Sequence, residues 1–107
     1  DKSFRRMMAK ADARLLAFGH THKPFHKILS AGDEVRHAIN IGSVGKPKDG
    51  DPRACYVILE WKELDFEDPE SLSVEFRRVS YDVEKSASAI EESPLPDPFA
   101  DMLREAY

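Results

Sequence analysis

Two short runs of the chain, residues 15–18 and 56–61, carry apolar side chains on both faces of an extended backbone. Successive side chains of a strand point to opposite sides of its sheet, so strands of this kind need apolar cover on both sides. The first run directly follows residues 3–12, whose apolar residues recur at helical spacing with Ser3 as a candidate N-cap. A helix that leads into a doubly covered strand predicts an α/β fold built in layers.

The remaining elements are predicted from periodicity and from chain-breaking residues. We expect irregular structure in the Pro- and Gly-rich segment 46–53, and two C-terminal helices that begin at Asp82 and Asp97, with Pro98 at the first position of the second. Alternation and composition predict the further strands and a turn. The strands are expected at 25–29, 37–41, 55–61 and 73–79, and the turn at 31–34.

Length and charge limit the functional classes. The 107 residues fit one small domain, and a net charge of -4 without a basic stripe gives no strong nucleic-acid footprint. No apolar run reaches the roughly 18 residues of a membrane span, and the absence of a secretory segment favours the cytoplasm. The single cysteine, Cys55, lies in an apolar run and is expected to be packed in the core. The chain begins at Asp1 rather than Met, so we expect a longer protein.

The stretch Phe18-Gly19-His20-Thr21-His22-Lys23-Pro24 follows the first strand. Side chains two residues apart point the same way in an extended backbone, so His20 and His22 can face one metal ion. A turn that carries two surface histidines is the alternative for so short a motif. His26 and His37 do not share this spacing, and we expect them to be surface or internally satisfied histidines.

Three blocks together resemble a known family. They are Phe18-Gly19-His20-Thr21-His22-Lys23-Pro24-Phe25, Asn40-Ile41-Gly42-Ser43-Val44-Gly45 and Asp49-Gly50-Asp51-Pro52-Arg53-Ala54. In this order and spacing they are similar to the C-terminal part of a calcineurin-like metallophosphoesterase, with the small bacterial and archaeal phosphodiesterases as nearest kin. Residues 75–82 also resemble the closing strand of that branch. The chain departs from the usual pattern at Ile41, where the branch has Pro, and we expect only a local effect on the loop.

The resemblance implies the α/β fold of a four-layer α-β-β-α sandwich with mixed sheets, of which residues 1–107 are the C-terminal portion of a single domain. It implies two divalent transition-metal ions (Mn, Zn, Fe or Ni) with His20 and His22 as the last two ligands. The remaining ligands and the catalytic histidine belong to upstream motifs that these 107 residues lack. The implied reaction is hydrolysis of phosphomonoesters or phosphodiesters, including nucleotides, by a metal-activated water.

The resemblance leaves some roles open. Asn40, Gly42 and Ser43 are candidates for substrate binding, with the Gly42-Ser43 turn offering its backbone N–H groups to a phosphate. The alternative for this turn is that its glycines merely allow a tight bend of the chain. The isolated chain is expected to bind metal weakly, to be inactive and to self-associate through its doubly apolar strands. The alternative function is a non-catalytic scaffold on the same fold that binds protein partners.

Overall fold

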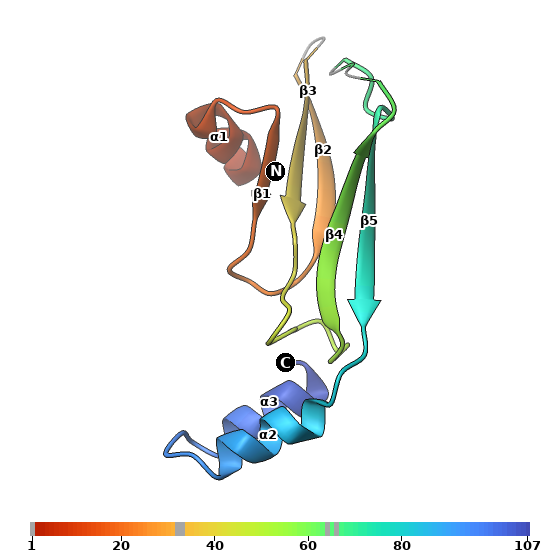
Figure 1. Cartoon of the computed structure of the whole chain (residues 1–107). Helices are drawn as coiled ribbons and strands as arrows, with labels where there is room; N and C mark the ends of the chain where they lie inside the picture. Colours follow the sequence, from red (N-terminus) through yellow and green to blue (C-terminus); the bar gives the residue numbers. More distant parts are fainter. Residues whose placement is uncertain (1, 32–33, 64, 66) are drawn as a thin grey trace.

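The computed structural model describes residues 2–31, 34–63, 65 and 67–107. Its elements follow one another as a helix, five strands and two helices, drawn in Figure 1. They are α1 (Lys2–Ala11), β1 (Leu15–Phe18), β2 (Phe25–Ala31), β3 (Glu34–Asn40), β4 (Ala54–Trp61), β5 (Leu72–Val79), α2 (Val83–Glu91) and α3 (Pro98–Glu105). The α/β class predicted from the sequence is therefore confirmed, with one sheet that is mixed.

The mixed sheet has the strand order β1-β3-β2. Strand β1 runs parallel to β3, with Phe18 opposite Asn40, and β2 runs antiparallel to β3, with Phe25 opposite the same Asn40. Because β1 and β3 are parallel, their carboxyl ends lie at the same end of the sheet. The loops that follow these two strands therefore leave the sheet side by side (Figure 1).

Helix α1 packs on the mixed sheet through its apolar side. Met8 forms the centre of a buried cluster with Leu29 and Ala38, and Phe4 of the helix meets the ring of Phe25 edge-on with centroids 5.4 Å apart. This confirms the amphipathic helix expected at residues 3–12. The N-cap prediction was wrong, because the helix already begins at Lys2 and Ser3 lies inside its first turn.

Strands β4 and β5 form the second sheet, an antiparallel hairpin in which Ala54 lies opposite Val79 and Trp61 opposite Leu72. The hairpin was predicted within one residue at each end. The turn predicted at 31–34 is only partly testable, since residues 32–33 lie outside the described residues and Ala31 and Glu34 are strand residues. Strand β3 begins three residues earlier than the predicted residue 37. It ends at Asn40, so residue 41 belongs to the loop that follows the sheet.

The two C-terminal helices pack against each other at the end of the hairpin where β5 finishes (Figure 1). Asp82 caps α2 as predicted, since its carboxylate accepts a hydrogen bond from the Lys85 N–H at 3.1 Å. Asp97 does not cap α3, because its own backbone is helical and its side chain makes no capping bond. Pro98 occupies the first turn as predicted. Among the described residues, no helix is long and apolar enough to cross a membrane.

Candidate metal centre

His20 and His22 lie on the loop that leaves β1, in an unusual backbone conformation. Both have positive φ angles, 80° for His20 and 61° for His22. This left-handed conformation is unfavourable for a residue that has a Cβ, so the surrounding structure must hold it in place. The side chain of His20 is exposed and that of His22 is half-buried. Backbone of this kind occurs at ligand-binding positions and also at helix ends, such as Ala106 after α3.

The side chain of Asn40 braces this loop from the end of β3. Its amide nitrogen donates to the Gly19 carbonyl at 3.2 Å and to the Thr21 hydroxyl at 2.9 Å, and its amide oxygen accepts from the Gly42 N–H at 3.0 Å. Asn40 is completely buried. The histidine loop and the loop after β3 are therefore joined through one buried amide, as the parallel pairing of β1 and β3 allows.

The ring of His22 is oriented by a backbone carbonyl. Its Nδ1 lies 2.7 Å from the Lys46 carbonyl oxygen, and its own carbonyl accepts from the Lys48 N–H at 3.2 Å. A carbonyl oxygen only accepts, so Nδ1 carries the proton and Nε2 of the neutral ring keeps its lone pair. A hydrogen bond that fixes one ring nitrogen and leaves the other for a metal is the usual arrangement of a ligand histidine.

This donor set fits a divalent transition metal as part of a larger set. Neutral imidazole suits manganese, iron, nickel or zinc, and His22 presents its Nε2 as such ions require. The described residues contain no cluster of three or more histidine, cysteine or carboxylate side chains that could hold an ion by themselves. His22 can therefore offer one nitrogen to a coordination shell, which other groups would have to complete.

The residues predicted to contact substrate form a tight turn. Gly42 has a φ of 76°, and a Cβ at this position would lie 2.9 Å from the sulfur of Cys55. The Ser43 hydroxyl accepts from the Lys46 N–H at 3.0 Å, and its carbonyl accepts from the Cys55 N–H at 3.0 Å. These contacts support the structural explanation for Gly42. Contact of Asn40, Gly42 or Ser43 with a substrate stays a prediction.

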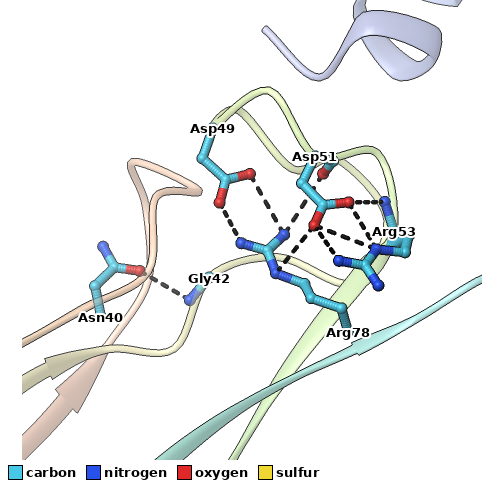
Figure 2. Close-up of polar contacts among 6 residues, drawn as sticks. All are labelled: Asn40, Gly42, Asp49, Asp51, Arg53 and Arg78. Carbon is cyan, nitrogen blue, oxygen red and sulfur yellow. Dashed lines mark hydrogen bonds and ion pairs between the residues drawn. The ribbon is translucent and has the colours of Figure 1, made fainter.

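The segment after this turn is fixed by charged groups, which Figure 2 shows. Arg78 of β5 pairs with both carboxylate oxygens of Asp49. Asp51 pairs with Arg53 at 2.8 Å, and the hydrogen bonds from Arg53 lower the pKa of Asp51 to about 2. The contact of Arg78 with this segment could not be predicted from the sequence, since a single arginine in a strand gives no signal of its partner.

The other two histidines contact each other across β2 and β3. His26 Nε2 lies 2.9 Å from His37 Nδ1, and the rings stack with centroids 5.2 Å apart. Burial lowers the pKa of both, and for His37 the proximity of His26 lowers it further. One ring must donate and the other accept, so the two imidazoles satisfy each other. This agrees with the expectation that neither belongs to the histidine loop.

Cys55 has no features of a reactive thiol. It is 2% exposed and packs beneath Gly42. Burial raises the pKa of its thiol, which keeps the group protonated and unreactive at neutral pH. The sequence-based expectation of a packed core cysteine is confirmed.

The fold has a counterpart among solved metallophosphoesterases. The crystal structure of a metallophosphoesterase from Sphaerobacter thermophilus matches 90% of this chain with a TM-score of 0.67 and 31% sequence identity. The chain is also 33% identical to an uncharacterized protein of Methanocaldococcus jannaschii, in an alignment 94 residues long that covers 78% of this chain. No family model matches the chain.

These similarities concern only part of each relative. The chain spans 43% of the Sphaerobacter protein and 35% of the Methanocaldococcus protein. The similarity therefore supports a metallophosphoesterase type of fold.

Proposed function

We propose that these 107 residues are the C-terminal portion of a calcineurin-like metallophosphoesterase domain, and that His20 and His22 are metal ligands in it. The observation that carries the proposal is the 2.7 Å contact between His22 Nδ1 and the Lys46 carbonyl, which leaves Nε2 as the coordinating nitrogen. The similarity to a solved metallophosphoesterase supports the same assignment. The complete domain would have the four-layer α-β-β-α architecture, with the remaining ligands on another part of it.

The residues of this chain would position the metals and leave the chemistry to groups outside it. Bound divalent ions would supply an activated water and neutralise charge on the phosphoryl oxygens. His22 would hold its Nε2 toward them, and Asn40 would keep both loops together at the sheet end. The substrate class is a phosphomonoester or phosphodiester, nucleotides included, and the proposed compartment is the cytoplasm.

Ser43 is the best candidate for a substrate contact among the three predicted residues. The Gly42 N–H is already used by Asn40, whereas a hydroxyl that accepts a hydrogen bond from Lys46 can still donate its own proton. A Ser43→Ala variant of the complete protein should therefore raise KM for a phosphate ester. An unchanged KM would assign Ser43 to the turn alone.

The test of the proposed function compares two pairs of histidines. In the complete protein, hydrolysis of bis-p-nitrophenyl phosphate with added manganese should be lost in the double variant His20→Ala/His22→Ala. Replacement of His37 by Gln is the matched control and should keep most of the activity. The isolated 107 residues should show no turnover, because they lack most of the coordination shell. Robust turnover by the isolated chain would contradict the proposal, and so would full activity of the double variant.

The scaffold alternative is less well supported by the loop geometry. A surface that binds proteins does not require an imidazole to be held in one tautomer over a strained backbone. The exposed apolar side chains of Ile28, Tyr56 and Val79 are consistent with the proposal that the isolated chain self-associates. Sedimentation should show species larger than a monomer, and a clean monomer with a cooperative melt would refute self-association.

A further inference from the structure

We propose that Arg78 is a positioning residue for His22: it fixes the segment from Lys46 to Asp51 and thereby keeps the His22 ring in the form with Nε2 unprotonated. The inference deepens the proposed function and rests on it for the identity of the ligand that Nε2 would bind. The coupling itself is a property of the metal-free chain. It can therefore be tested without any catalytic activity.

Arg78 grips the segment at several points. Its side chain is only 16% exposed, and two of its nitrogens pair with the two carboxylate oxygens of Asp49. A third contact, of 3.5 Å, reaches the Asp51 carbonyl, and Nε lies 3.8 Å from the Asp51 carboxylate. A guanidinium group offers five donors in one plane, so it can hold a carboxylate and a carbonyl together in a fixed orientation. Figure 2 shows this arrangement.

The segment from Lys46 to Asp51 has a second anchor besides Arg78. The Gly50 N–H donates to the Ala106 carbonyl at 3.0 Å, where α3 ends in a left-handed turn. Asp51 is paired with Arg53 at 2.8 Å. Arg78 thus supplies the contact from β5, and the end of α3 supplies a second anchor. Loss of Arg78 would free one side of the segment while the other remains fixed.

The path from Arg78 to His22 is short and continuous. Lys46 and Lys48, on either side of the buried Pro47, hold His22 from two directions. The Lys46 carbonyl accepts from His22 Nδ1 at 2.7 Å, and the Lys48 N–H donates to the His22 carbonyl at 3.2 Å. Asp49, the partner of Arg78, is the next residue along the chain. A shift of Asp49 would therefore displace both groups that hold His22.

A purely structural role for Arg78 makes a different prediction. Arg77 is the matched control, because it lies next to Arg78 on β5 and pairs with Glu75 at 3.1 Å, away from the segment. Its pair is exposed on both sides. If Arg78 served only the hairpin, Arg77→Gln and Arg78→Gln would affect His22 alike. If Arg78 positions His22, only Arg78→Gln changes the state of that ring.

The experiment is long-range ¹H–¹⁵N NMR of the imidazoles in the metal-free full chain at neutral pH. Wild-type His22 should be in the Nδ1–H form. In Arg78→Gln the ratio of Nδ1–H to Nε2–H forms should fall by about fivefold, the equivalent of one ordinary hydrogen bond. Arg78→Lys should recover part of the ratio, since Lys keeps the positive charge but lacks the planar set of guanidinium donors. Asp49→Asn should act in the same direction, and Arg77→Gln should leave the ratio unchanged.

A second readout is zinc affinity of the same proteins, measured by competition with a chelator. If Arg78→Gln disturbs the bond between His22 and the Lys46 carbonyl, its zinc affinity should fall about tenfold, whereas the zinc affinity of Arg77→Gln should stay unchanged. An unchanged His22 tautomer in folded Arg78→Gln would overturn the proposal, and if that variant does not fold, an unchanged tautomer in Asp49→Asn would do so. A tautomer shift in a complete protein that binds no zinc would sink the proposed function while the positioning role stands.

Discussion

The four histidines form two pairs that differ in what occupies their ring nitrogens. In the loop after β1, His22 gives one nitrogen to a backbone carbonyl and keeps the other available. On β2 and β3, His26 and His37 bond to each other at 2.9 Å and satisfy themselves. Two imidazoles close together do not make a ligand site. A ligand histidine needs a hydrogen-bond partner that fixes one ring nitrogen and leaves the other nitrogen available to the metal.

The largest expected difference between the pairs is in metal binding. His22→Ala in the complete protein should lower zinc affinity by about 100-fold or more. Loss of a residue that only hydrogen-bonds to a ligand lowers metal affinity by about 10–100-fold, and here the ligand itself is removed. His37→Gln should leave affinity within about twofold. Metal content after dialysis and competition titration measure both. Equal losses in the two variants would remove the distinction between the pairs.

The next prediction concerns Gly42, which anchors the histidine loop through Asn40. Gly42→Ala should destabilise the fold by about 1–3 kcal/mol, since φ is positive and the new Cβ meets Cys55. Chemical denaturation measures the change. Gly45→Ala is the control and should cost less than about 0.5 kcal/mol, because nothing lies within 4 Å of its Cβ position. Similar costs at both glycines would show that the turn is not constrained as described.

The histidine pair on β2 and β3, His26 and His37, should make stability depend on pH. The pKa of His26 and His37 is lowered from 6.5 in the fold, so the unfolded chain binds protons more readily as pH falls. Stability should be highest above pH 6.5 and decline below it, toward the lowered pKa values of the folded state. Denaturation at pH 8 and pH 5.5 measures the slope, and His37→Gln should flatten it. A slope that is unchanged in this variant would exclude the pair as its source.

The smallest effect is expected at the side chain of Lys46. Its ammonium group lies 5.2 Å from the ring centroid of Phe99, a contact worth about 0.5–1 kcal/mol at an exposed site. Lys46→Ala should lose that amount in a thermal or chemical melt and leave the His22 tautomer intact, since the carbonyl that orients His22 belongs to the main chain. A change of tautomer in this variant would mean that the Lys46 side chain also holds the loop.

Sequence alone predicted the elements well where local patterns decide them. The helix at α1, the hairpin of β4 and β5 and the cap at Asp82 were all within reach of periodicity and capping rules. Asp97 fails as an N-cap because its own backbone is already helical, which a capping pattern in the sequence does not reveal. The full length of β3 was missed because Glu34 and Arg36 are polar, yet both belong to the sheet.

The candidate site was only half visible in the sequence. The spacing of His20 and His22 pointed to a metal, and the structure supplies what spacing cannot, namely the carbonyl that sets the tautomer of His22. Any residue could provide a carbonyl, so Lys46 gave no signal. Asn40 was noticed for a possible contact with substrate, and its observed contacts are with the two loops that it joins.

The most direct test of this account is the crystal structure of the complete protein soaked with manganese or zinc, with anomalous scattering used to locate the ions. We predict an ion at bonding distance, about 2.0–2.2 Å, from Nε2 of His22, with Nδ1 still bonded to the Lys46 carbonyl. Ions at His26 and His37 instead, or coordination of His22 through Nδ1, would contradict it.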